Sequence, residues 1–131
     1  MKNLEELIQI ALDNKKNSYS PYSNFRVSAV VLTKTGKIYR GVNIENASYS
    51  VTICGERSAL AAAISDGERE FDTIVITGDG DYTFPCGVCR QFMAEFFDKN
   101  TKLVIAKSVS EFKIYTMKDL LPHSFSKKDL E

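Results

Sequence analysis

The sequence has no net charge, a single histidine and no long apolar run, and each of these features excludes a class of protein. Its 131 residues include 17 Lys and Arg against 17 Asp and Glu, whereas a dedicated nucleic-acid binder usually relies on a basic face. No apolar stretch approaches the roughly 20 residues of a membrane span, and the first residues lack the apolar region of a signal peptide. We therefore expect a cytoplasmic protein that binds neither nucleic acid nor membrane.

Cysteine is scarce as well, and its three residues do not suit a framework of disulfides, which needs an even number. In the cytosol a thiol is more often a metal ligand or a reactive group. The three occur as Cys54-Gly55-Glu56 and Pro85-Cys86-Gly87-Val88-Cys89. Three thiolates can hold Zn²⁺ and leave its fourth position open for a water, and Glu56 is placed to move that water's protons. The sequence thus predicts a hydrolytic zinc centre.

The pattern along the chain predicts a single domain over residues 1–131 in which helices and strands alternate. Helices are expected over 3–16, 54–65 and 86–97, a helical turn over 116–121, and strands over 25–33, 38–42, 71–77, 103–106 and 112–115. The last two strands are joined by residues 107–111 alone, which is too short for a parallel crossover. The expected fold is a three-layer α/β/α sandwich with a mixed five-stranded sheet whose last two strands are antiparallel.

The positions of the cysteines favour one shared site. Cys86 and Cys89 are three residues apart at a predicted helix start and project to the same side. Cys54 begins another predicted helix, and the positive end of a helix favours thiolate over thiol. Three thiolates on a dication leave an excess negative charge, which we expect Arg57 to offset by donating hydrogen bonds to the sulfurs.

Other interpretations of these residues remain open from the sequence. Cys86 and Cys89 alone also fit a redox pair, although this gives Cys54 and Glu56 no role. A closed structural site would need His123, the only histidine, as its fourth ligand. Arg57 and Arg90 also fit plain surface charges.

Over nearly its whole length the chain resembles the small cytidine deaminases. The zinc motifs match the signature of zinc deaminases, in which Cys or His precedes x-Glu and Pro-Cys-x-x-Cys follows. The resemblance extends to Tyr19-Ser20-Pro21-Tyr22-Ser23 with Phe25-Arg26-Val27, to the segment from Gly41 to Ala47, to Cys89-Arg90-Gln91, and to Leu120-Leu121-Pro122 with Phe125.

This resemblance implies specific roles for further residues. Asn43 and Glu45 would hold the ribose 3′-hydroxyl, and Phe25 would pack against the pyrimidine ring. Ala47 and Gly55 would contribute backbone groups. Tyr49 and Phe125 would reach the site of a neighbouring subunit, because the family is typically homotetrameric. Glu56 would bind the base as well as carry protons.

The implied reaction is hydrolysis of cytidine and 2′-deoxycytidine to uridine and 2′-deoxyuridine with release of ammonia, as in pyrimidine salvage. Two positions depart from the family pattern: Gly55 is usually alanine, and Ser28 is often glycine, so that Ser28 is expected to narrow the space beneath the base. Three alternatives share parts of the pattern, namely a deaminase of a nucleoside-like antibiotic such as blasticidin S, a nucleic-acid editing enzyme, and a zinc-stabilised structural module.

Overall fold

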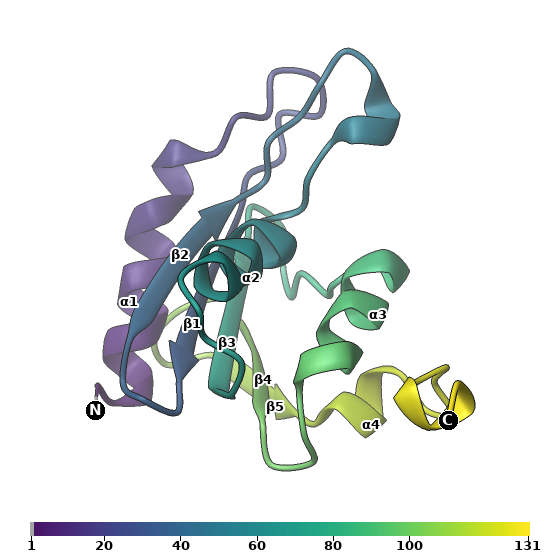
Figure 1. Ribbon diagram of the computed structural model, residues 1–131. Helices are drawn as coiled ribbons and strands as arrows, with labels where there is room; N and C mark the ends of the chain where they lie inside the picture. The colour runs from purple at the N-terminus through teal and green to yellow at the C-terminus, as the bar shows by residue number, and fades with distance from the viewer. Residues whose placement is uncertain (1) are drawn as a thin grey trace.

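The computed structural model describes residues 2–131. Within that range the strands form one sheet, and the helices pack against it (Figure 1). The helices are α1 (Leu4–Asn14), α2 (Gly55–Ser65), α3 (Gly87–Phe96) and α4 (Met117–Leu120). The strands are β1 (Val27–Thr33), β2 (Ile38–Val42), β3 (Phe71–Gly78), β4 (Lys102–Ala106) and β5 (Phe112–Tyr115). Every expected element is present, and the ends differ from expectation by at most two residues.

The sheet is mixed, as the sequence predicts. Its order is β2-β1-β3-β4-β5. Strand β1 is antiparallel to both β2 and β3, β3 and β4 are parallel, and β4 and β5 are antiparallel, with Leu103 opposite Tyr115. The short connection over residues 107–111 therefore forms the antiparallel pair that its length requires.

Helices cover both faces of the sheet, which confirms the three-layer arrangement (Figure 1). Alternate residues of a strand point to opposite faces, so each central strand supplies two separate cores. On the α1 face, the buried residues are Leu7, Ile8, Ala11, Val30, Leu32, Val75, Val104 and Ala106. The other core, against α2, α3 and α4, includes Ala29, Val31, Ala59, Leu60, Ile74, Ile76, Met93 and Met117.

Helix α1 begins where its sequence predicts. The Asn3 side chain accepts a hydrogen bond from the Glu6 backbone N–H at 2.9 Å and so satisfies one of the free donors at the helix start. The apolar stripe that includes Leu7, Ile8 and Ala11 is buried against the sheet. A capping side chain and an apolar stripe of helical period are therefore sufficient to specify this element.

Helix α2 lies unusually close to β2 at Gly41. A Cβ atom on Gly41 would lie 2.2 Å from the Ala59 backbone nitrogen and 2.6 Å from the Gly55 carbonyl oxygen. A glycine is required here because any side chain would push the helix away from the sheet. The position of the start of α2, and of the residues it carries, depends on this close contact.

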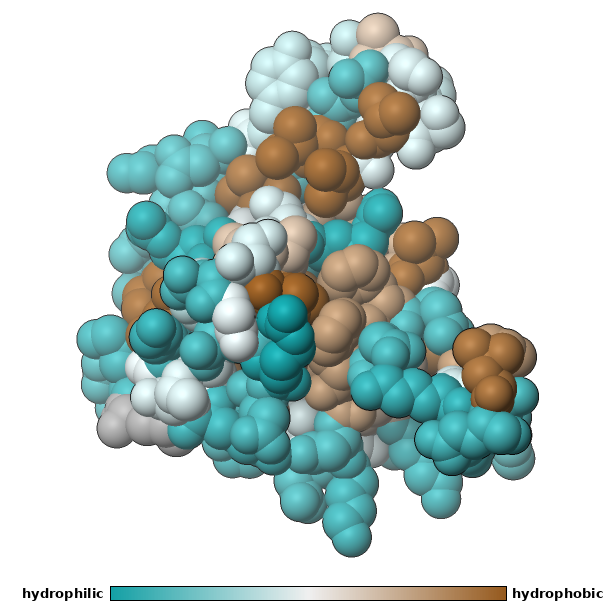
Figure 2. All heavy atoms as spheres, viewed as in Figure 1, coloured by the Kyte–Doolittle hydropathy of each residue, from teal (hydrophilic) through white to brown (hydrophobic). Residues whose placement is uncertain are grey.

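Residues 43–53 form an arm that projects beyond the sheet (Figure 1). Its base is closed by an antiparallel bridge between Ile44 and Ile53, and it contains a 3₁₀ turn at Tyr49–Val51. Ile44, Val51 and Ile53 are exposed, and apolar surface gathers where the arm joins the body, above a largely hydrophilic lower part (Figure 2). Within residues 2–131, none of the helices has the length and apolar character that crossing a membrane requires.

Candidate metal centre and adjoining cleft

The three cysteines, which lie up to 35 positions apart in the sequence, meet where two helices begin. Cys54 and Cys86 are the N-cap residues of α2 and α3, and Cys89 lies in the first turns of α3. The Sγ atoms of Cys54 and Cys86 are 3.8 Å apart, and all three Sγ atoms lie within 4.8 Å of one another. The predicted convergence of two helix N-termini on one site is confirmed.

The spacing of the sulfurs fits zinc. Zinc–sulfur bonds of about 2.3 Å in a tetrahedral site place neighbouring sulfurs about 3.8 Å apart. Among the described residues, no fourth His, Cys, Asp or Glu belongs to this group. His123 instead lines a separate surface hollow beside Met117 and Lys118. A closed Cys₃His site is therefore wrong for this chain, and the described residues leave the fourth zinc position open.

The electrostatics of the cluster also favour a bound cation. Hydrogen bonding with Cys89, followed by Arg57, lowers the pKa of the Cys54 thiol well below its usual value. The same contact with Cys54, together with burial, raises the pKa of Cys89. One thiolate therefore opposes formation of the next, and a bound dication removes this conflict because a coordinating thiol is deprotonated outright.

Arg57 lies where the sequence analysis expects it. Its Nη2 atom donates to the Cys54 sulfur at 3.7 Å and to the Thr52 carbonyl at 3.4 Å. The pKa of Arg57 is raised, chiefly by the hydrogen bond to Cys54. The guanidinium group therefore holds positive charge against a zinc ligand, although its effect on the metal stays a prediction.

Glu56 is buried beside the thiols. It lies in the first turn of α2, is 3% exposed, and lines a cavity of about 180 Å³ together with Cys54 and Cys86. Burial raises the pKa of its carboxyl group above the usual value. A carboxyl group in this state can both hold and release a proton, as a proton carrier must.

Asn43 and Gly55, which the resemblance assigns to the site, also line the cavity. Five further wall residues were not assigned from the sequence: Val27, Thr52, Ile53, Thr83 and Phe84. Thr83 and Phe84 immediately precede Pro85-Cys86 and could have been found by their closeness to a ligand. Val27 and Thr52 gave no local signal, because only the packing of β1 and the arm brings them to the cavity.

Of the two departures from the family pattern, Gly55 lines the cavity and Ser28 does not. A Cβ atom on Gly55 would lie 3.3 Å from Val27 Cγ1, a tight contact, so glycine leaves additional room in the cavity. Ser28 is opposite Thr77 in the sheet and follows Val27, which faces the cavity. Its buried side chain therefore points to the α1 face. The expectation that Ser28 narrows the space beneath the base is not supported by this geometry.

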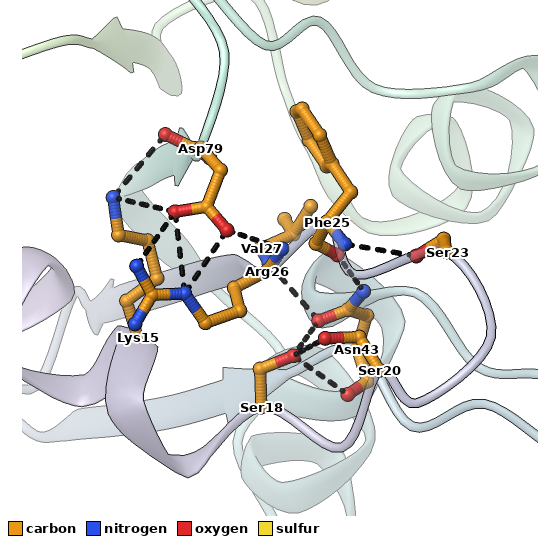
Figure 3. Close-up of polar contacts among 10 residues, drawn as sticks. Lys15, Ser18, Ser20, Ser23, Phe25, Arg26, Val27, Asn43 and Asp79 are labelled. Carbon is orange, nitrogen blue, oxygen red and sulfur yellow. Dashed lines mark hydrogen bonds and ion pairs between the residues drawn. The ribbon is translucent and has the colours of Figure 1, made fainter.

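Asn43 lies at the edge of the cavity and is held firmly (Figure 3). Its Nδ2 atom donates to the Phe25 carbonyl at 2.8 Å, and its Oδ1 atom accepts from the Val27 N–H at 2.9 Å. The Ser18 hydroxyl also donates to Oδ1. One amide N–H therefore remains free of protein partners and is available to a ligand.

Glu45 lines a second hollow of about 330 Å³ with Tyr22, Ser23, Tyr49 and Thr52. One carboxylate oxygen accepts from the backbone N–H groups of Tyr22 and Ser23 at 2.9 and 3.1 Å, and the other accepts from the Ser23 hydroxyl. These bonds, led by the Ser23 hydroxyl, lower the pKa of Glu45. Thr52 lines both hollows, so they are neighbours.

Three further predicted residues do not line the cavity within one chain. Phe25 borders it only through its backbone contact with Asn43. Ala47 is exposed on the arm, and Phe125 is 60% exposed near the C-terminus. Their assigned roles stay predictions.

Arg90 has a structural role that the sequence did not reveal. It donates from Nε to the Pro85 carbonyl and from Nη1 to the Leu120 carbonyl, both at 2.8 Å. It therefore ties the segment before Cys86 to the end of α4, and a plain surface charge is a wrong description of it.

Comparison with known proteins gives a consistent result. The family model for the cytidine and deoxycytidylate deaminase zinc-binding region matches residues 1–106. The chain is 45% identical over 129 residues to a probable cytidine deaminase of Dictyostelium discoideum, covering 97% of this chain and 86% of that protein. It is 41% identical over 125 residues to a cytidine deaminase of Halalkalibacterium halodurans, covering 95% of each.

Solved structures share the fold. A cytidine deaminase from Burkholderia pseudomallei superposes with a TM-score of 0.90 at 37% identity, covering 95% of this chain and all of that one. A cytidine deaminase from Mycobacterium tuberculosis gives a TM-score of 0.83 at 28% identity, covering 95% of this chain and 98% of that one.

Proposed function

Since the chain belongs to the cytidine deaminase family of zinc-binding proteins, we propose that it hydrolyses cytidine and 2′-deoxycytidine. The products are uridine or 2′-deoxyuridine and ammonia. One observation carries the proposal: three sulfurs lie within 4.8 Å of one another, and two of them, from Cys54 and Cys86, line the same cavity as the buried Glu56. We place this activity in pyrimidine salvage and in the cytoplasm, where thiols stay reduced.

The catalytic proton transfers belong to Glu56. Cys54, Cys86 and Cys89 would hold zinc, which would supply a water activated by a lowered pKa of about 7. Glu56 would take a proton from this water as its oxygen adds to C4 of cytosine, and would give that proton to N3. It then passes a second proton to the 4-amino group, which leaves as ammonia, while the C4 oxygen becomes the carbonyl of uracil. Burial of Glu56 supports this role because bulk water cannot replace it.

The sugar is held by Asn43 and Glu45, two residues apart in an extended segment. A hydroxyl group both accepts and donates one hydrogen bond. The remaining amide N–H of Asn43 supplies the donor, and the carboxylate of Glu45, already ordered by Tyr22 and Ser23, supplies the acceptor. The 3′-hydroxyl of either nucleoside satisfies both groups. Phe25 packs against the base, and the Ala47 and Gly55 backbones complete its contacts.

The enzyme acts as a homotetramer in which Tyr49 and Phe125 complete neighbouring sites. The exposure of both aromatic side chains, together with that of Val51, Ile53 and Val88, supports this assembly. Tyr49, Val51 and Ile53 lie on the arm, Val88 lies on α3, and Phe125 lies beyond α4 near the C-terminus. Light scattering on the purified protein should give four times the monomer mass. A monomer with full activity would contradict this part of the proposal.

The deciding experiment measures zinc per chain and the change of cytidine absorbance to that of uridine in one preparation. Deoxycytidine and blasticidin S compete in parallel reactions. One zinc per chain with turnover of both pyrimidine nucleosides is expected. Preference for blasticidin S would identify an antibiotic deaminase, and one zinc per chain with no turnover would indicate a structural module instead.

A further inference from the structure

Asp79 joins two segments that lie 53 positions apart in the sequence. It follows the last residue of β3, and Arg26 precedes the first residue of β1. The Asp79 N–H donates to the Arg26 carbonyl at 3.0 Å, and the Arg26 N–H donates to Asp79 Oδ2 at 2.8 Å. The pairing of β1 with β3, which ends at Val27 and Gly78, is therefore continued by one residue, through its backbone N–H and its carboxylate.

The Asp79 carboxylate also binds two cations (Figure 3). The Arg26 guanidinium donates from Nη2 to Oδ1 at 2.9 Å and from Nε to Oδ2 at 3.0 Å. Lys15, which follows α1, lies 3.4 Å from Oδ1 and donates to the Gly78 carbonyl. The side chains of Asp79 and Lys15 are only 24% and 19% exposed. One carboxylate thus links α1, β1 and β3.

The segment of residues 25–27 is held from its other side by Asn43. Asn43 bonds the Phe25 carbonyl and the Val27 N–H, whereas Asp79 bonds both backbone groups of Arg26. Figure 3 shows the two side chains on opposite sides of this segment. Successive residues of this segment are therefore held alternately by Asn43 and Asp79, an arrangement that we call the clamp. Loss of the Asp79 carboxylate would remove the acceptor of the Arg26 N–H and weaken the clamp on that side.

Asp79 also sets the surface on which Phe25 rests. The next residue is Gly80, and a Cβ atom placed on it would lie 3.3 Å from both Cε2 and Cζ of Phe25. The Phe25 ring therefore packs directly against the Gly80 backbone. Asp79 fixes the backbone that carries this ring and the backbone beneath it. Val27, in the same segment, lines the cavity beside Glu56.

We propose that Asp79 is a positioning residue for the nucleoside, acting through the Phe25–Val27 segment. This inference rests on the proposed function, in which Phe25 packs against the base. Partly exposed ion pairs contribute little to stability, but forked hydrogen bonds fix orientation. Loss of the Asp79 carboxylate should therefore weaken substrate binding more than it lowers folding stability or zinc content.

The test compares Asp79→Asn with two matched controls. Asp81 lies in the same loop and pairs with Lys107 at 2.8 Å, and Asp98 pairs with Lys34 at 2.7 Å far from the cleft. Asp79→Asn should raise KM for cytidine about 10-fold with kcat little changed and full zinc content. Asp81→Asn and Asp98→Asn should leave KM unchanged. An unchanged KM in Asp79→Asn, or an equal rise in Asp81→Asn, overturns the proposal.

Two further measurements separate positioning from a structural effect. If Asp79 acts through Phe25, then Asp79→Asn should raise KM much less in a Phe25→Ala background than alone. Arg26→Gln, which keeps the carboxylate, should give a KM rise in the same direction. Additive effects in the double variant contradict the proposal.

The clamp is also tested without substrate, so that its failure is distinct from failure of the proposed function. Amide hydrogen exchange over residues 25–27 should accelerate in Asp79→Asn and not in Asp81→Asn. Unchanged exchange overturns the inference even if cytidine is turned over. Absence of wild-type turnover, with faster exchange in the variant, contradicts the proposed function and removes cytidine as the molecule that Asp79 positions.

Discussion

Replacement of Glu56 by glutamine is the sharpest test of the proton-transfer step. Glutamine has nearly the same size and leaves the three sulfurs in place, but it cannot carry a proton. General acid–base groups contribute about 10²- to 10⁴-fold to rate, and Glu56 is 3% exposed in a cavity of about 180 Å³. Because bulk water has little access, we expect a loss near the upper end, about 10³-fold or more in kcat.

This loss corresponds to at least about 4 kcal/mol of transition-state stabilisation, since each tenfold change in rate is about 1.4 kcal/mol. Stability should not fall in parallel. Burial raises the pKa of Glu56, so ionisation of this carboxyl group opposes folding of the metal-free protein. Neutral glutamine should therefore keep or raise the Tm of that form.

The assay follows cytidine absorbance together with zinc per chain. Glu45→Gln serves as a matched control because its carboxylate lies in the neighbouring hollow, bonded to Tyr22 and Ser23. It should raise KM and leave kcat within a few-fold. The reasoning fails if Glu56→Gln binds one zinc and retains more than about a tenth of wild-type kcat.

Further predictions follow from other contacts. Arg57→Gln removes the donor to the Cys54 sulfur and should weaken zinc affinity about 10- to 100-fold, measured by competition with a chelator. Unchanged zinc affinity would show that Arg57 does not stabilise the bound metal. Chelation of zinc should lower Tm without unfolding the protein at room temperature, because two apolar cores remain on either side of the sheet. Gly41→Ala should destabilise the protein by about 3 kcal/mol or more in urea unfolding, since its Cβ atom would meet the α2 backbone at 2.2 Å. The hydrogen bond to Asp66 raises the pKa of Tyr39 from 10.0 to about 12, so its stabilising contribution is complete below pH 10 and lost as the pH rises toward 12. Thermal unfolding across that range should show a smaller decrease in Tyr39→Phe than in the wild type, and parallel curves would rule out this contribution.

Local patterns determined much of the fold. The apolar stripe and Asn3 cap specify α1, and the short connection over residues 107–111 requires antiparallel β4 and β5. These features depend on periodicity, capping and chain length, which act between near neighbours and can be read directly from the sequence. The zinc ligands belong to the same class, because two cysteines three residues apart at a helix start must project together.

Which residues surround the site was decided by the tertiary structure. Ser28 points to the α1 face and Val27 to the cavity because of the register and pleat of β1. Arg90 reaches the Leu120 carbonyl only because α3 and α4 pack together. Asp79 meets Arg26 only because β1 and β3 are neighbours, although β2 and α2 separate them in the sequence.

The sequence by itself therefore determined the reactive groups: three sulfurs, one carboxylate, and the helices that begin beside them. Tertiary packing decided the walls of the cleft and the contacts that hold them. The physical reason is that strand register and the approach of helix to sheet minimise the free energy of the whole core, so no short segment of the chain encodes them alone.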